Sequence, residues 1–250
     1  MTPPRRALIT GAGAPHGIGL ACARALGQTG LQLAIAATTD RIFARQAELQ
    51  AEGFSVTAHI ADLTDPAQVA RLVAELGAVD VLVNNAGMGS LNVPAKSRKF
   101  ALSDDAYWQH SFAATFEPTR LMTRAMLPGM MQAGWGRIIQ IGSVTGPLVA
   151  IAGSAAYGAA KAAITGLSHT LALEVAGSGV TVNIVAPGWI ATEASATAEH
   201  AAARRSPMGR AGRPDEVAAV IVFLASELAS YVNGATIVVD GGNILQEKKA

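Results

Sequence analysis

Seven short apolar runs recur along the chain, each bounded by Gly, Pro, Asn or Asp, at 6–10, 31–37, 55–60, 79–83, 137–142, 180–186 and 235–239. Runs of this length between turn-forming residues predict buried strands. Apolar residues at helical spacing predict helices between them at 18–28, 41–52, 66–76, 104–133, 156–176 and 214–228. Strand and helix in alternation predict an α/β fold, in which seven parallel strands form one doubly wound sheet with helices on both faces.

No internal repeat, low-complexity tract or linker interrupts this alternation over the 250 residues. Half of the residues are apolar and 15% are charged, a composition that buries a sizeable core rather than one typical of disorder. We therefore expect a single domain over 1–250.

The composition also argues against several classes of function. A net charge of +1 gives no strong field for nucleic acid or an anionic membrane. The longest apolar run, 218–225, is too short to span a bilayer, and Arg5 and Arg6 are not followed by the apolar core of an export signal. Five scattered histidines give no metal-ligand spacing, and the lone Cys22 fits a reducing cytoplasm. A serine hydrolase is not indicated, because no Gly-x-Ser-x-Gly elbow is present.

The first predicted strand runs into the glycine-rich stretch Thr10–Gly19, TGAGAPHGIG, which opens the first helix. Glycines there let the backbone turn tightly and approach a pyrophosphate, whose charge the helix N-terminus stabilises. A lone glycine fingerprint is weak, but this one lies in the first unit of an alternating chain. It predicts a Rossmann-type dinucleotide site that includes Gly11, Gly13, Gly17, Ile18 and Gly19; the alternative is a glycine-rich turn without a ligand.

The end of the second strand indicates which dinucleotide is preferred. A carboxylate there holds the ribose diol of NAD, whereas basic or hydroxyl groups accept the 2′-phosphate of NADP. Ala37 stands where we expect the carboxylate, and Thr38, Thr39 and Arg41 follow it, which favours NADP(H). Asp40 leaves two alternatives open: it caps the next helix, or it holds the ribose of NAD(H).

Further polar residues follow the third and fourth strands. Asp62 and Leu63 come after the third strand, and Asn85, Ala86 and Gly87 belong to an Asn-Asn-Ala-Gly segment after the fourth. Both positions are carboxyl ends of strands, the rim where such sheets bind ligands. Taken singly, these residues are also typical of turns and helix caps.

A serine, a tyrosine and a lysine lie within the stretch from Ser143 to Lys161. Tyr157 and Lys161 are four apart in a predicted helix and so share a face. An ammonium near a phenol favours the phenolate and lowers its pKa, so the pair predicts a general acid and base. Ser143 ends an apolar run, where its hydroxyl can bond to a substrate oxygen. The alternative is a tyrosine that only packs, since such a short motif arises often by chance.

Taken together, these features resemble the short-chain dehydrogenase/reductase family over nearly the whole chain. Two further segments add to the likeness: Pro187–Thr192, PGWIAT, after the sixth strand, and Val239–Gly242, VDGG, near the end. Within the family, the chain is most similar to the bacterial 3-oxoacyl-carrier-protein reductases and their carbonyl-reductase relatives.

The resemblance implies a role for each matched residue. Tyr157 would donate a proton to a substrate carbonyl, Lys161 would bind the nicotinamide ribose and lower the pKa of the tyrosine, and Ser143 would polarise the carbonyl. The other matched positions would contact the dinucleotide: Asp62 and Leu63 at the adenine, Asn85, Ala86 and Gly87 along its length, and Pro187, Gly188, Ile190 and Thr192 towards the nicotinamide.

The chain departs from the family pattern at two places. Five residues separate Gly11 from Gly17, where the family usually has three, so either the loop is longer or Gly13 takes the first place. Counting back from the fifth strand puts Thr115 at the position of the family's fourth catalytic residue, an asparagine. That asparagine supports a water relay largely through its main-chain carbonyl, which threonine also has.

The stretch 193–210 falls where the family carries its substrate lid, and lids often gate turnover. Trp189 and Met208 are apolar candidates for a wall of the site, and Arg204 and Arg205 for contacts to an anionic tail. The alternative for the two arginines is a solvated basic helix face.

These observations predict an NADP(H)-dependent oxidoreductase that acts on a ketone or secondary alcohol, either a 3-oxoacyl group or a small carbonyl compound. Two alternatives are an NAD-dependent alcohol dehydrogenase of the same family and a dinucleotide-binding scaffold without turnover. The long segment 89–100 favours a free small ketone or alcohol over a carrier-bound substrate. The two longest predicted helices resemble those that pair in family tetramers, so we expect a homotetramer, with a dimer as the alternative.

Overall fold

Seven strands pair in parallel to form one sheet, in the order β3-β2-β1-β4-β5-β6-β7. The computed structural model describes residues 4–87, 97–193, 195 and 197–247. The strands are β1 (Arg6–Thr10), β2 (Gln32–Ala37), β3 (Val56–Ile60), β4 (Val81–Asn84), β5 (Gly136–Ile141), β6 (Val180–Pro187) and β7 (Thr236–Val239).

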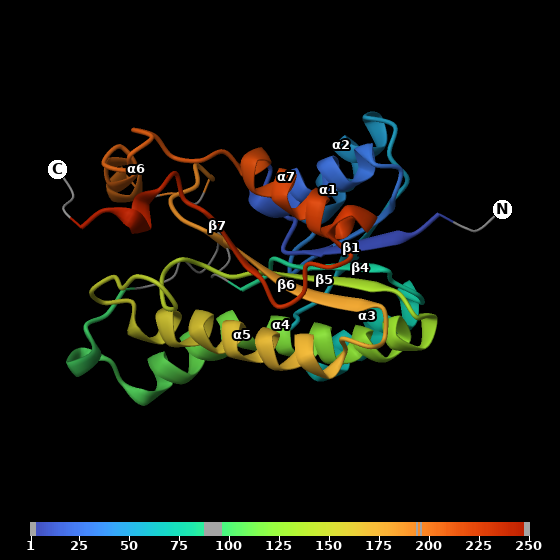
Figure 1. Cartoon of the computed structure of the whole chain (residues 1–250), viewed down its shortest axis with the longest axis horizontal. Coiled ribbons are helices and arrows are strands. Elements are labelled where there is room, and N and C mark those ends of the chain that lie inside the picture. The colour runs from blue at the N-terminus through green and yellow to red at the C-terminus, as the bar shows by residue number, and fades with distance from the viewer. Residues whose placement is uncertain (1–3, 88–96, 194, 196, 248–250) are drawn as a thin grey trace.

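Helices cover both faces of the sheet (Figure 1). On one face lie α1 (Ile18–Gln28), α2 (Arg41–Ala51) and α7 (Pro214–Ala225). On the other lie α3 (Pro66–Leu76), α4 (Asp105–Ala133) and α5 (Ala155–Glu174). A short helix, α6 (Thr197–Ala203), lies near the C-terminal end of the chain, apart from both layers. Three single turns complete the list: η1 (Phe100–Leu102), η2 (Glu227–Ala229) and η3 (Asn243–Leu245).

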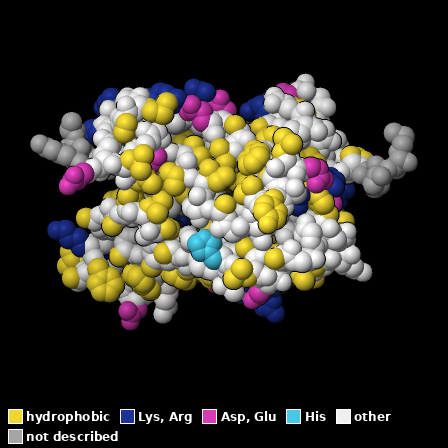
Figure 2. Space-filling view, viewed as in Figure 1, with side chains coloured by type: hydrophobic (Ala, Val, Ile, Leu, Met, Phe, Trp, Pro, Cys, Tyr) yellow, Lys and Arg dark blue, Asp and Glu magenta, His cyan; other side chains and the backbone are white. Residues whose placement is uncertain are grey.

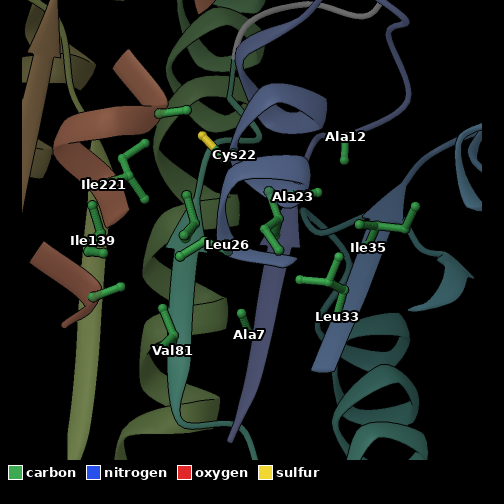
Figure 3. Packing of buried hydrophobic residues seen from close by; sticks show 14 of the residues in the cluster. Ala7, Ala12, Cys22, Ala23, Leu26, Leu33, Ile35, Val81, Ile139 and Ile221 are labelled. Atoms are coloured by element: carbon green, nitrogen blue, oxygen red, sulfur yellow. The ribbon is translucent and has the colours of Figure 1, made fainter. Parts of the chain in front are cut away.

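Two apolar cores hold the layers together, one on each face of the sheet. The first joins β1, β2, β4 and β5 to α1, α2 and α7, with Leu26, Ile35 and Ile221 fully buried (Figure 3). The second contains Leu8 and Met122 and joins the other face to α3, α4 and α5. Successive strand residues point to opposite faces, so strands covered on both sides need mostly apolar residues, as in the run 33–37 of β2.

The strand order fixes where a ligand can enter. From β1 the chain builds β2 and β3 to one side and then returns to add β4 on the other side of β1. At this reversal the loops leaving β1 and β4 diverge, and open α/β sheets bind ligands in the crevice that results at the carboxyl ends of the strands. The predicted site residues therefore belong to one edge of the sheet.

The predicted fold class is confirmed, and all predicted strands and helices are present with their ends shifted by a few residues. The sequence analysis missed α6, which lies inside the predicted lid. Within the described residues, no helix is both long and apolar enough to cross a bilayer. The same residues contain no group of His, Cys, Asp or Glu side chains able to hold a metal ion.

Candidate active site

The glycine-rich loop brings the ends of β1 and β4 into close contact. A Cβ atom on Gly11 would lie 2.9 Å from the Cα atom of Ala86, and one on Gly19 would lie 2.7 Å from the Nδ2 atom of Asn85. Gly11 also has a φ of 68°, which favours glycine. Gly17 is the N-cap of α1 and has no side chain to cover the first turn. The loop therefore leaves a glycine-lined cradle at a helix N-terminus, which fits a pyrophosphate.

The Asn85 side chain holds the glycine-rich loop in place through hydrogen bonds. Its Nδ2 atom donates to the carbonyls of Thr10 and Gly11, at 3.0 Å each. The Thr10 hydroxyl in turn accepts the backbone N–H groups of Asn85 and Ala86, also at 3.0 Å. Asn85 thus acts on the loop through its amide rather than presenting that amide to a ligand. Ile18 packs against the first core, and its helix follows directly from the cradle.

The end of β2 lies beside the same loop. A Cβ atom on Gly13 would lie 3.1 Å from the Cβ atom of Ala37. Beyond it, Arg41 donates from Nε to the Thr39 hydroxyl at 3.5 Å, while Thr38 is exposed. Asp40 is the N-cap residue of α2, as one alternative expected, but within the described part of the chain its side chain makes no capping bond. A guanidinium and two hydroxyls therefore follow the end of β2, where the sequence places no carboxylate at position 37.

Asp62 and Leu63 lie at the carboxyl end of β3. The Oδ1 atom of Asp62 accepts from the N–H and the hydroxyl of Thr64, at 2.9 and 2.7 Å, so Asp62 does form the turn that the sequence left open. Its side chain is still exposed at the rim. The Leu63 side chain is buried in the second core, so only its backbone can contact an adenine.

Ser143, Tyr157 and Lys161 come together at the carboxyl end of β5. The Nζ atom of Lys161 donates to the carbonyl of Ile141 at 2.8 Å and lies 5.8 Å from the centre of the Tyr157 ring. The shared helix face predicted for the tyrosine and lysine is therefore present. The loop after β5 reaches α5 only because Gly146, with a φ of 111°, allows it; a Cβ atom there would lie 2.3 Å from a helix carbonyl.

The ionisation of this group is controlled mainly by burial. Burial raises the pKa of Tyr157, a hydrogen bond with Ser143 lowers it, and the Glu199 carboxylate raises it again. Burial also lowers the pKa of Lys161 from 10.5 to about 8. The expectation that the ammonium lowers the phenol pKa below its ordinary value is wrong here, because loss of hydration outweighs the effect of a charge at this distance.

Thr115 lies on α4 and faces the cradle through its backbone. A Cβ atom on Gly87 would lie 2.7 Å from the Thr115 carbonyl oxygen, so the two backbones touch. The Thr115 hydroxyl donates to the Ser111 carbonyl at 2.9 Å, inside its own helix. Pro118, three residues on, has no N–H and deprives the Ala114 carbonyl of its helical donor. The side chain is thus used within the helix.

Residues 188–193 follow β6 and form one wall of the candidate site. The Pro187 carbonyl accepts from the N–H of Val144, which ties this wall to the loop carrying Ser143. A Cβ atom on Gly188 would lie 2.6 Å from that of Asp240, in the segment that follows β7. The hydrogen bond to Pro187 thus places this wall beside the loop that carries Ser143.

Ser195 is a site residue that the sequence reasoning missed. Its hydroxyl donates to the Ile190 carbonyl at 2.9 Å, accepts the Thr192 N–H at 3.0 Å and lies 3.1 Å from the Thr192 hydroxyl. A serine three residues after a threonine is the only signal in the sequence, and hydroxyl turns of this kind are common.

Within the predicted lid, 193–210, the structure describes all residues except Ala194 and Ala196. The segment contains α6, whose last residue, Ala203, is buried. Arg204 and Arg205 are exposed, and Met208 packs against Gly241 near the C-terminus. Most of the segment 89–100 lies outside the described residues.

A glycine cradle at the switch point of a parallel sheet, with a phenol, an ammonium and a hydroxyl at the same edge, defines a dinucleotide-binding oxidoreductase. A family model described as enoyl-(acyl carrier protein) reductase matches residues 11–243. The chain belongs to the short-chain dehydrogenase/reductase family, whose members are oxidoreductases.

Three relatives illustrate the range of the family near this chain. A 3-oxoacyl-[acyl-carrier-protein] reductase of Vibrio harveyi is 38% identical over 242 residues, covering 94% of this chain and 96% of that protein. A 2-keto-3-deoxy-L-fuconate dehydrogenase of Xanthomonas campestris is 36% identical, covering 95% and 79%. The structure of a gluconate 5-dehydrogenase from Burkholderia cenocepacia in complex with NADP and tartrate superposes with a TM-score of 0.86 at 31% identity, covering 97% and 96%.

Proposed function

We propose that the protein is an NADP(H)-dependent oxidoreductase that moves a hydride between the nicotinamide and a ketone or secondary alcohol, with Tyr157 as general acid and base. The observation that carries the proposal is the convergence of Ser143, Tyr157 and Lys161 beside a glycine cradle. When bound, the nicotinamide supplies or accepts the hydride.

Each catalytic side chain has one task in this proposal. In reduction, the Tyr157 hydroxyl donates its proton to the substrate oxygen, which gains negative charge as the carbonyl carbon takes up hydride. The Ser143 hydroxyl, already bonded to Tyr157, donates to the same oxygen and orients it. The Lys161 ammonium is fixed by the Ile141 carbonyl and stabilises the phenolate that forms. In oxidation, Tyr157 takes the proton back.

NADP(H) is favoured over NAD(H) by the groups that follow β2. Arg41 and Thr39 are in contact and Thr38 is exposed beside them, whereas Ala37 offers no carboxylate to a ribose diol. The related gluconate 5-dehydrogenase was determined with NADP, which supports this choice. Asp40 is the group that would serve NAD(H) instead.

The substrate is a 3-oxoacyl group or a small carbonyl compound, since relatives of both kinds match the chain at similar identity. In this proposal the segment 193–210, which contains α6, acts as the lid over it. Loop motions of this kind often limit turnover.

We also propose a homotetramer in the cytoplasm. The helices α4 and α5 pack side by side, and Met131 and Leu173 leave large apolar side chains exposed on them. Apolar side chains spread over much of the face shown in Figure 2, with charged ones mainly near its margin. Light scattering after gel filtration separates a tetramer from a dimer, and cell fractionation tests the compartment.

The deciding experiment titrates the purified protein with NADPH and NADH and then adds a panel of ketones and 3-oxoacyl esters while absorbance of the reduced nicotinamide is followed. We expect NADPH to bind more tightly than NADH, and at least one compound of the panel to cause oxidation of NADPH. Binding without consumption in either direction would support the scaffold alternative, and a preference for NADH would support an NAD-dependent alcohol dehydrogenase.

A further inference from the structure

A buried polar cluster lies between the helix α4 and the strands β4 and β5. The Thr123 hydroxyl accepts from the Nδ2 atom of Asn84 at 2.9 Å and from the Nε2 atom of Gln140 at 3.1 Å. All three residues are at most 2% exposed. Asn84 and Gln140 are partners in the parallel register of β4 and β5, so their side chains point to the same face of the sheet and reach the same hydroxyl. Thr123 therefore joins two strands to one helix.

Thr123 supplies a bond that fixes each amide. Its hydroxyl oxygen has two acceptor positions, and the two amides use both. Within the described residues, the Oδ1 atom of Asn84 and the Oε1 atom of Gln140 have no hydrogen-bond partner. The surrounding layer is apolar, with Met122 and Ile138 buried in it, so apolar side chains would pack here without needing such bonds. A polar cluster in this place serves to specify a position.

The two strand residues directly precede two supports of the candidate site. Asn84 is followed by Asn85, whose amide holds the glycine-rich loop. Gln140 is followed by Ile141, whose carbonyl accepts from the Lys161 ammonium at 2.8 Å. The peptide unit between neighbouring residues is rigid, so a shift of either buried residue displaces the support that follows it.

Two prolines interrupt the hydrogen bonding of α4 on either side of Thr123. Pro118 and Pro128 lie inside the helix, and each removes a backbone donor. Contacts with the sheet therefore matter more for the position of the turn between them. The same helix carries the Thr115 carbonyl, which lies against Gly87 in the loop after β4.

We propose that Thr123 is a positioning residue that holds the glycine cradle in place through Asn84 and the catalytic ammonium in place through Gln140. The inference rests on the proposed function and extends it to a residue buried inside the fold. Through Asn84 the hydroxyl supports binding of NADPH, and through Gln140 it supports the chemical step. The two effects are separable, because each amide makes its own bond to Thr123.

The test measures two quantities: the NADPH dissociation constant, and kcat with saturating NADPH and the panel ketone that the wild type consumes fastest. Thr123→Val keeps the shape and loses the hydroxyl, so the dissociation constant should rise and kcat should fall, each by about fivefold, as expected for one lost hydrogen bond. Thr123→Ser keeps the hydroxyl and should behave like the wild type. The matched control is Thr181→Val, which removes a buried hydroxyl that has no hydrogen-bond partner within the described residues, at the amino end of β6. It should leave both quantities unchanged.

Two strand variants separate the two effects. Asn84→Leu removes the bond from β4 and should raise the dissociation constant with kcat unchanged. Gln140→Met removes the bond from β5 and should lower kcat with the dissociation constant unchanged. A residue that only stabilised the fold would not divide the two quantities in this way. Each strand variant keeps the other bond to Thr123, so these two decide the question if Thr123→Val does not fold.

Unchanged values in Thr123→Val, no recovery in Thr123→Ser, or the same losses in Thr181→Val overturn the inference while leaving the oxidoreductase intact. Equal changes of both quantities in Asn84→Leu and Gln140→Met also overturn it. If the wild type consumes no ketone, the proposed function fails, and the dissociation constants alone decide the role of Thr123. A rise in Thr123→Val and Asn84→Leu, with the other variants like the wild type, then supports the inference, and any other pattern overturns it.

Discussion

Replacing Lys161 by methionine should leave the protein as stable as the wild type, or more so, while abolishing turnover. The side chain is buried, and its Nζ atom donates to the Ile141 carbonyl. Methionine has a similar length and fills the same space without a charge. Lys161, which is central to the proposed chemistry, is thus expected to lower the free energy of unfolding.

The magnitude follows from the pKa of the ammonium. Burial lowers it from 10.5 to about 8, and a difference of about 2.5 corresponds to about 3 kcal/mol of unfolding free energy lost below pH 8. Removing the ammonium recovers this amount but leaves the Ile141 carbonyl without its donor, at a cost of about 1–3 kcal/mol. The net change is a gain of about 0–2 kcal/mol.

The sign of the pH dependence gives a sharper test. The pKa is lower in the folded state, so between pH 8 and 10.5 the unfolded chain binds more protons and wild-type stability rises relative to the variant, by up to about 3 kcal/mol. Urea unfolding of both proteins at a series of pH values measures this difference, with Lys99→Met, an exposed lysine, as the control. The reasoning would be refuted if the unfolding free energies of wild type and Lys161→Met changed in parallel with pH. It would also be refuted if the variant lost more than about 3 kcal/mol of unfolding free energy at neutral pH.

Three further variants test the other parts of the site. Tyr157→Phe should lower kcat by about 10²- to 10⁴-fold with an unchanged NADPH dissociation constant, because only the proton donor is lost; comparable turnover would contradict the assignment. Gly19→Ala should weaken binding of both NADPH and NADH, because its Cβ atom would lie 2.7 Å from the Nδ2 atom of Asn85, whereas Gly129→Ala, with open space around it, should bind both normally. Arg41→Ala should weaken NADPH binding and spare NADH, measured by fluorescence titration, and an equal effect on both would argue against a phosphate contact.

The fold was predictable because burial on both faces is visible in the sequence itself. Apolar runs such as 33–37 admit no solvated face, and a parallel sheet is the structure that buries strands in this way. The helix α6 was not predictable, because its seven residues, TAEHAAA, are too few for an apolar period. Short elements fixed by tertiary contacts carry little signal of their own.

The site was predictable in its residue types and less so in their contacts. The spacing of Tyr157 and Lys161 specifies a shared helix face, and the structure has it. No local pattern shows that the Asn85 amide braces the glycine loop or that the Thr115 hydroxyl bonds within its own helix, since both depend on which segments meet in space. The pKa of Tyr157 was predicted in the wrong direction because sequence reveals a neighbouring charge more readily than loss of hydration.

The burial that lowers stability at Lys161 also makes the Lys161 ammonium a stronger acid than the Tyr157 phenol. It lowers the pKa of the ammonium to about 8 and raises that of the Tyr157 phenol above its ordinary value. In the proposed reduction Tyr157 becomes a phenolate, and the ammonium is then the stronger acid of the two. Proton transfer from the Lys161 ammonium to the Tyr157 phenolate is therefore favourable in free energy. A lysine kept in water would lack this advantage. The loss of stability expected from Lys161 is thus linked to the proton transfer to Tyr157. Hydration of the lysine would remove the loss of stability and also the advantage in proton transfer.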